Sequence, residues 1–165
     1  MAVRQQPAFP TRRAGLAFWL VALVLGALGC AHLAPLPPPV QDRVLTAVEG
    51  LLGAPYRSGG MDASGVDCSG LTLAAYRAAG FSLPRSVAGQ MAGGQPVDED
   101  QLAPADLVFF RGPDAGRCAA THCGIYLGDG RFAHASSSRG VIISRLDGGY
   151  WRDRYVGARR YASQH

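Results

Sequence analysis

Helical patterns occupy the first half of the chain and short strand-like runs the second, and this order constrains the fold more than any other feature. Apolar residues recur at helical spacing over 41–52, and a second helix is predicted over 68–79, between Asp67 as N-cap and Gly80 as stop. A short helix follows near 86–92. Turn signals then separate five strand-like runs: 106–111, 121–127, 131–136, 141–145 and 155–161. Helices followed by strands predict an α+β domain with an antiparallel sheet.

The first 29 residues have the pattern of an export signal. Three arginines precede an uncharged apolar run over 14–28, which is shorter than the about 20 residues that a membrane-spanning helix needs. Small residues then lead into Cys30, as in a bacterial lipobox, so we expect Cys30 to be lipidated and to become the mature N-terminus. Ordinary signal cleavage nearby, or a retained N-terminal anchor, are the alternatives.

The positive charge of the chain lies largely in this signal. The sequence has 16 Arg plus Lys, all of them Arg, against 12 Asp plus Glu, and its formal net charge is +4. Removing residues 1–29 removes three Arg and no acidic residue, which leaves 13 Arg, 12 acids and a net charge of +1. We therefore expect no nucleic-acid binding.

A Pro-rich segment follows the lipidation site. Residues 30–40 are predicted to form the lipidated end and an extended, semi-rigid tether. The body over 41–165 is long enough to bury about two-thirds of its surface. It shows no internal repeat, so we predict one domain, which we expect to be monomeric.

Cys68 is the strongest candidate nucleophile. It stands at the predicted start of the second helix, directly after Gly65-Val66-Asp67. A helix N-terminus stabilises a thiolate through its free N–H groups and its dipole, and the same N–H groups can face a developing oxyanion. The alternative is a buried structural cysteine.

Two histidines lie on neighbouring predicted strands, and the hairpin between them decides whether they meet. A two-residue loop at 129–130 would place His122 and His134 on opposite faces of the sheet. A three-residue loop at 128–130 makes them diagonal neighbours on one face, roughly 7–8 Å apart at Cα. We predict the three-residue loop; a bulge elsewhere would also change the parity.

The composition limits what can orient a catalytic base. The sequence contains no Asn, so a Cys-His site needs a different third residue. We expect His122 to act as base and His134 to hold its ring. For either histidine, a hydrogen-bonded structural role is the alternative. The sequence also contains no Lys, which excludes a P-loop lysine, a Schiff-base lysine and a Ser-Lys dyad.

Six motifs occur in order along the chain: GAPYRSGG at 53–60, DCSGL at 67–71, LPRS at 83–86, DLVFF at 106–110, HCGIYLGDG at 122–130 and FAHA at 132–135. Together they resemble the NlpC-type family of bacterial cell-wall cysteine peptidases, over about 44–161. The resemblance implies a papain-like fold, a Cys-His-His site without metal or cofactor, and hydrolysis of amide bonds in peptidoglycan stem peptides or cross-links.

The resemblance also implies roles for four further residues. Tyr56 falls at the family tyrosine beside the nucleophile and would help the oxyanion site; a core tyrosine is the alternative. Three other residues fall at family positions that line or support the cleft: Asp67, Ser69 and Arg85. A role in helix capping or packing is an equal alternative for each of them.

One position departs from the family pattern. Cys123 stands where the family usually has Val, and Cys118 lies five residues earlier. In an oxidising compartment the two are predicted to form a disulfide; two free thiols, or a metal site with a histidine, are the alternatives. Strand alternation should point Cys123 away from the face of His122 and so spare the active site.

These inferences make an envelope-anchored peptidoglycan endopeptidase the leading hypothesis. Ala31 follows Cys30, where an Asp would favour retention, so we expect the lipid anchor to lie in the outer membrane and the domain to face the periplasm. A non-hydrolytic cell-wall binding module on the same fold is one alternative. A related Cys-His acyltransferase or amidase acting on another amide is the second.

Overall fold

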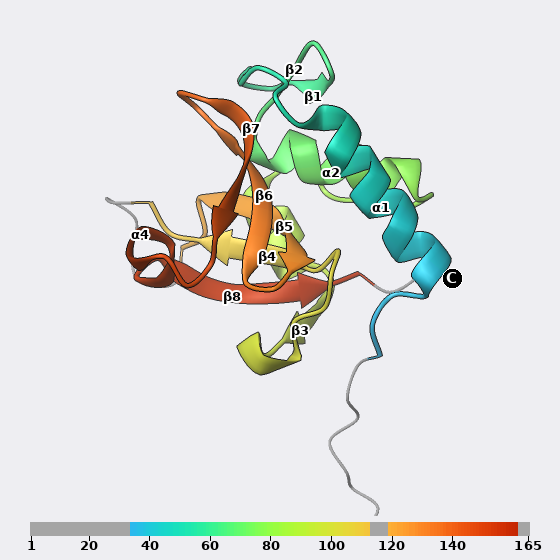
Figure 1. Ribbon diagram of the computed structural model, residues 1–165, viewed down its shortest axis with the longest axis vertical. Helices are drawn as coiled ribbons and strands as arrows, with labels where there is room; N and C mark the ends of the chain where they lie inside the picture. Colours follow the sequence, from blue (N-terminus) through green and yellow to red (C-terminus); the bar gives the residue numbers. More distant parts are fainter. Residues whose placement is uncertain (1–33, 113–118, 162–165) are drawn as a thin grey trace, which may run out of the picture. The chain divides into compact units, whose positions relative to one another are not determined.

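The computed structural model describes residues 34–112 and 119–161, which form a six-stranded antiparallel sheet with the longer helices packed on one face and a short helix over 149–152 on the other (Figure 1). The helices are α1 (Pro38–Leu51), α2 (Cys68–Ala78), α3 (Val87–Ala92) and α4 (Gly149–Arg152). The sheet has the order β3-β8-β4-β5-β6-β7. Its strands are β3 (Gln95–Val97), β4 (Leu107–Phe110), β5 (His122–Gly128), β6 (Arg131–Ser136), β7 (Gly140–Arg145) and β8 (Tyr155–Arg160).

The predicted α+β class is confirmed, and the five predicted strands correspond to β4 through β8. The sequence patterns missed edge strand β3, in which Pro96 interrupts the strand signal while the strand pairs with β8. They also missed a two-stranded hairpin, β1 (Met61–Asp62) and β2 (Gly65–Val66), in a segment predicted to be loop. Strands this short give no readable alternation.

Helix α1 begins earlier than predicted. It starts at Pro38, and prolines occupy its first turn, where the missing N–H groups would have no partner within the helix. Leu36, just before the helix, is only 5% exposed and belongs to the core. The prediction of an extended tether is therefore wrong for the end of 30–40, and residues 30–33 lie outside the described part of the chain.

The start of α2 is fixed by its cap. The Asp67 carboxylate accepts a hydrogen bond from the Gly70 N–H at 2.7 Å, as the predicted N-cap requires. Further along, Leu71, Ala75 and Tyr76 are fully buried. The helix is thereby held against the sheet, where it contacts β5 and β6.

The sheet has two apolar faces. One packs under α1 and α2 and contributes Leu107, Phe109, Cys123 and Ile125 to the larger core. The opposite face carries a smaller cluster that includes Phe110 and Phe132, together with Trp151 from α4. Because side chains alternate along β5, His122 lies on this second face and Cys123 on the helix face.

The hairpin between β5 and β6 places His122 and His134 on the same face of the sheet, as predicted, but its loop differs from the predicted one. Ile125 pairs with Ala133 and Tyr126 with Phe132, which is the register expected of the three-residue loop. However, Gly128 pairs with Arg131, so the loop itself has two residues, 129–130, both with positive φ (53° and 68°). The predicted loop length is therefore wrong: a bulge between Tyr126 and Gly128 shifts the register instead.

A buried ion pair joins β8 to the residue just before β4, its neighbour in the sheet. The Arg160 guanidinium on β8 donates to the Asp106 carboxylate before β4 at 2.7 and 2.6 Å, and the two side chains are 2% and 1% exposed. The Arg160 guanidinium also donates a hydrogen bond to the Gln101 carbonyl at 2.9 Å. This bond holds the segment before β4 against β8.

Candidate active site

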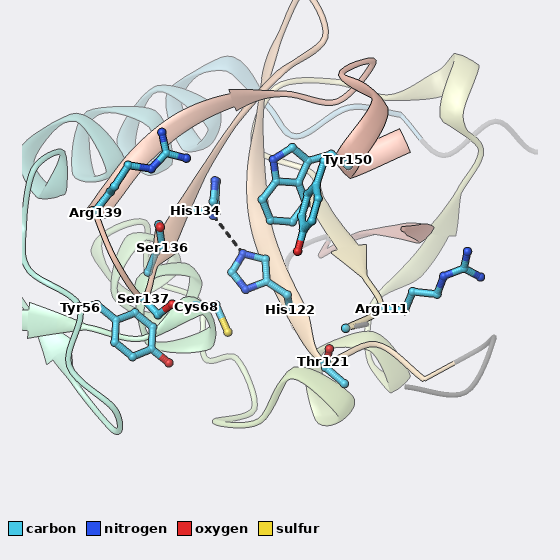
Figure 2. A pocket seen from close by; sticks show the side chains of 13 residues that line it. Tyr56, Cys68, Arg111, Thr121, His122, His134, Ser136, Ser137, Arg139 and Tyr150 are labelled. Atoms are coloured by element: carbon cyan, nitrogen blue, oxygen red, sulfur yellow. Dashed lines mark hydrogen bonds between the residues drawn. The ribbon is translucent and has the colours of Figure 1, made fainter. Parts of the chain in front are cut away.

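Cys68 opens into a cleft of about 600 Å³ at the N-terminus of α2 (Figure 2). Helix α2 supplies Cys68, β5 supplies His122 and β6 supplies His134. In Figure 2 the Cys68 sulfur lies between the Tyr56 ring and the His122 imidazole. The structure thus brings together the three residues predicted to carry the chemistry.

The two imidazoles are directly bonded. His122 Nε2 lies 3.0 Å from His134 Nδ1, and the bond is drawn in Figure 2. Since Nε2 is engaged in this way, Nδ1 is the nitrogen of His122 left for the Cys68 thiol, with which His122 also forms a hydrogen bond. His122 therefore lies between the Cys68 thiol and His134, which is the arrangement that the predicted roles require.

His134 is buried and held in one orientation. Its Nε2 lies 2.9 Å from the Ser144 hydroxyl on β7, and the residue is 2% exposed. Burial, with the charges of His122 and Arg139, lowers the pKa of His134 to about 3. A neutral His134 with its proton on Nε2 donates to the Ser144 hydroxyl and leaves Nδ1 free to accept a hydrogen bond from the Nε2–H of His122. This arrangement fixes the orientation of the His122 ring toward Cys68.

The Cys68 thiol is strongly acidified. Its pKa is lowered to about 4, mainly by a hydrogen bond with the Cys123 thiol, then by hydrogen bonding and charge attraction with His122. Burial opposes these effects. At neutral pH the group is therefore a thiolate, which is the nucleophilic form.

This acidity predicts the pH dependence of Cys68 alkylation. Iodoacetamide reacts with the thiolate, so its rate with Cys68 should stay nearly constant from pH 8 to about pH 5 and halve near pH 4, where the thiolate takes up a proton. Alkylation can be followed by peptide mass spectrometry. In His122→Ala the midpoint should move upward, because an attractive partner is lost. A wild-type midpoint near that of an ordinary thiol, about 8.5, would contradict this account.

Tyr56 stands at the mouth of the cleft and not in the core. It is 38% exposed and lines the cleft beside Cys68. Burial raises its pKa, and the negative charge of Cys68 adds to the shift. The hydroxyl therefore keeps its proton and is available as a donor, which suits the predicted oxyanion role.

Asp67, Ser69 and Arg85 form a network behind the nucleophile. Arg85 donates to Asp67 at 2.5 Å and to the Ser69 hydroxyl at 2.7 Å. Asp67 also accepts from the Gly59 N–H at 2.8 Å, in addition to its cap of α2. Burial raises the pKa of Asp67, but the bonds from Arg85 and from backbone N–H groups outweigh this and lower it. None of the three is among the residues that line the cleft, so they position the start of α2.

Several residues of the site were missed from the sequence. Trp151 on α4 stacks on His122 (5.3 Å between centroids, 24°) and meets His134 edge-on at 4.7 Å. Ser144 holds His134 from the neighbouring strand. At Gly124, a Cβ atom would come within 2.8 Å of the Phe132 ring, so only glycine fits there. The sequence HCGIYLG carried a signal for Gly124, whereas Trp151 and Ser144 become part of the site only through the fold.

Cys123 lies on the predicted side of β5, but this does not separate it from the active site. The residue is fully buried and a free thiol, in the core cluster against which Cys68 packs. The expectation that alternation spares the active site is wrong, because α2 and its cysteine cover that same face. Cys118 lies outside the described residues, so its disulfide with Cys123 stays a prediction.

Comparisons with known proteins identify the family of this chain. The NlpC/P60 family matches residues 53–160. The chain belongs to the NlpC/P60 family. Murein DD-endopeptidase MepS/Murein LD-carboxypeptidase of Escherichia coli K12 is 41% identical over 126 residues, covering 76% of this chain and 65% of that relative. Probable endopeptidase NlpC of the same organism is 39% identical over 150 residues, covering 86% and 95%.

Solved structures of NlpC/P60 proteins share the fold. A lipoprotein-like NLP/P60 protein of Staphylococcus aureus has a TM-score of 0.73 and 31% identity, covering 87% of this chain and 48% of that one. An NlpC/P60 protein of Bacillus cereus has a TM-score of 0.70 and 36% identity, covering 76% and 41%. These matches confirm the predicted family and the papain-like α+β fold.

Two further properties of the described NlpC/P60 domain concern ligands and membranes. Within 34–112 and 119–161, no three His, Cys, Asp or Glu side chains gather where they could hold a metal ion. Across the same ranges, no helix has the length and apolar character needed to cross a membrane.

Proposed function

We propose that this chain is a peptidoglycan endopeptidase that hydrolyses amide bonds in stem peptides or cross-links through a Cys-His-His thiol mechanism. The observation that carries the proposal is the 3.0 Å bond between His122 and His134 at the end of a cleft into which Cys68 opens. The names of the relatives, murein endopeptidases among them, support the substrate class. The chain spans 65% of MepS, so the activity of that relative is carried over as part of this proposal.

The steps follow from the arrangement of protons. The Cys68 thiolate attacks the amide carbonyl, and the oxyanion that forms faces the free N–H groups at the start of α2 and the Tyr56 hydroxyl. His122 gives its Nδ1 proton to the leaving amine, which breaks the C–N bond and leaves a thioester on Cys68. His122 then takes a proton from water, and the resulting hydroxide releases the acid and the thiolate. His134 remains neutral throughout and accepts from His122 Nε2.

The charge of the cleft supports an anionic substrate. Arg111 and Arg139 line it, and no acidic residue does so among the described residues. In Figure 2 these two arginines lie on opposite sides of the Cys68–His122 pair. The Arg139 charge also contributes to the lowered pKa of His134, which places it near the catalytic histidines. Peptidoglycan stem peptides carry carboxylates that fit these positions.

Reversing the charge of Arg139 should therefore weaken substrate binding. In Arg139→Glu we expect KM for a stem peptide with free carboxylates to rise about 10-fold or more, because a charged hydrogen bond is replaced by repulsion. For the same peptide with amidated carboxylates the change should be small, and kcat should change little in both. Arg131→Glu, at the far end of β6 and ion-paired to exposed Asp129, is the matched control. Equal effects on both peptides would contradict an electrostatic role.

The two alternatives from the sequence remain distinguishable by experiment. A non-hydrolytic binding module would be retained on purified sacculi without releasing soluble fragments. An acyltransferase or amidase acting elsewhere would leave muropeptide masses unchanged or transfer the acyl group to an added amine. The proposal expects soluble products whose masses differ from the substrate by added water. Sacculus binding without such products would favour the binding module.

We further propose that Cys30 is lipidated and anchors a monomeric domain to the outer membrane, where it faces the periplasm. The proposal rests on the basic and apolar segments before Cys30 and on Ala31 after it. In cells of a two-membrane bacterium, radiolabelled palmitate should be incorporated into the chain and not into Cys30→Ala. Incorporation into both forms would exclude lipidation at this residue.

A further inference from the structure

In the hydrolytic mechanism the buried thiol of Cys123 lowers the pKa of Cys68 but forms and breaks no covalent bond. This residue directly follows the base His122 on β5, and it is 0% exposed. A valine of similar size would fill the same apolar site. The thiol nevertheless sits next to the nucleophile, and its chemistry differs from that of a methyl group.

Cys68 and Cys123 differ in their access to solvent: Cys68 is partly exposed, whereas Cys123 is fully buried. Cys68 is partly exposed, lines the cleft and packs against the core cluster that contains Cys123. The two thiols lie close enough to affect each other, since Cys123 lowers the pKa of Cys68 and Cys68 adds to the raised pKa of Cys123. Behind Cys123, its Sγ lies 3.6 Å from Oε1 of the fully buried Gln90. A small oxidant entering from the cleft meets Cys68 first, with Cys123 as the thiol behind it.

We propose that Cys68 and Cys123 form a reversible oxidation site, in which a peroxide oxidises Cys68 and Cys123 captures the product as an intramolecular disulfide. In the first step the Cys68 thiolate attacks one peroxide oxygen, the O–O bond breaks, and the departing hydroxide takes up a proton to give water and Cys68 sulfenic acid. In the second step the Cys123 sulfur attacks the Cys68 sulfur and the S–O bond breaks. The hydroxide leaves with the Cys123 proton as a second water. The two sulfurs together lose two electrons, which reduce one peroxide.

Capture protects the enzyme while it is inactive. Sulfenic acid that finds no thiol is oxidised further to sulfinic acid, which thiol reductants do not reverse. While the disulfide is present, Cys68 has no free thiolate and the enzyme cannot hydrolyse its substrate. A dithiol reductant can restore the thiolate. A reductant thiolate attacks Cys68 from the cleft, Cys123 leaves and takes up a proton, and the second reductant thiol releases Cys68. This consequence rests on the proposed function, in which the acidic Cys68 thiolate belongs to an exported hydrolase that meets such oxidants.

The test uses the full chain carrying Cys30→Ser and Cys118→Ser, so that only Cys68 and Cys123 remain as thiols. After treatment with hydrogen peroxide, intact mass spectrometry should show the loss of two hydrogens, and peptide mapping should link the peptide of Cys68 to that of Cys123. With Cys123→Val added, the mass should instead gain two oxygens on Cys68. Activity recovered in dithiothreitol, relative to each protein before oxidation, should be about 10-fold lower in that variant.

Two results would overturn the proposal. One is sulfinic acid on Cys68 at the same rate with and without Cys123, with no linked peptide. The other is a Cys118–Cys123 link when the chain with all four cysteines is oxidised. The linked peptide is measured without substrate and without the Cys123 variant, so neither a poorly folded variant nor a failure of the proposed hydrolysis would obscure the result.

Discussion

Replacing His122 with alanine is expected to lower kcat/KM for muropeptide cleavage by about 10³–10⁵-fold. The His122 imidazole interacts with both the Cys68 thiol and His134, and it lies 3.0 Å from the latter. Without it, the leaving amine has no proton donor and the thiolate loses an attractive partner. Initial rates on a purified muropeptide, quantified by liquid chromatography, give the measurement.

His134→Ala separates the base from the residue that positions it. His134 acts only through His122, so the loss should be smaller, about 10–100-fold, and His134→Gln, which retains an acceptor, should recover part of it. Circular dichroism of each variant controls for folding. If His122→Ala kept more than a tenth of wild-type activity while folded, His122 would not be the base.

Replacing Asp106 with asparagine is expected to lower the free energy of unfolding by about 3–5 kcal/mol. The carboxylate and the Arg160 guanidinium are 1% and 2% exposed and bonded at 2.6 and 2.7 Å. The asparagine is nearly isosteric but uncharged, so the buried positive charge loses its counter-charge. Urea unfolding followed by tryptophan fluorescence measures the change.

A surface pair provides the matched control for this prediction. Arg145 and Asp147 are bonded at 2.6 Å, but their side chains are 61% and 52% exposed. Water already screens this pair, so Asp147→Asn should leave the unfolding midpoint unchanged. Equal midpoints for the Asp106 and Asp147 variants would contradict the claim that burial makes the Asp106 pair important.

Local sequence signals predicted the parts of the site that depend on short segments. Asp67 caps α2 and places Cys68 at the helix start because capping depends on a few adjacent residues. The sequence also predicted that His122 and His134 share one face of the sheet, but the predicted length of the loop between them was wrong. The turn residues at 128–130 are compatible with a two-residue and with a three-residue loop. The bulge before Gly128 depends on how the two strands pair, and a local sequence pattern does not predict that pairing.

Features that depend on which surfaces meet were not predictable in this way. Alternation along β5 placed Cys123 opposite His122, yet only the packing of α2 reveals that Cys68 lies on this side as well. Trp151 reaches the histidines from a four-residue helix whose sequence has no periodicity to recognise. The early start of α1 at Pro38 was hidden because proline suits both an extended tether and a first helical turn.

The most direct test of the central claim is digestion of a defined, cross-linked muropeptide by the wild-type chain and by Cys68→Ala, followed by mass spectrometry. The account predicts that the wild-type chain produces fragments whose summed mass exceeds that of the substrate by one water. It also predicts that the folded Cys68→Ala variant produces none under the same conditions. Equal fragment yields from both proteins would show that Cys68 is not the nucleophile and would contradict the account.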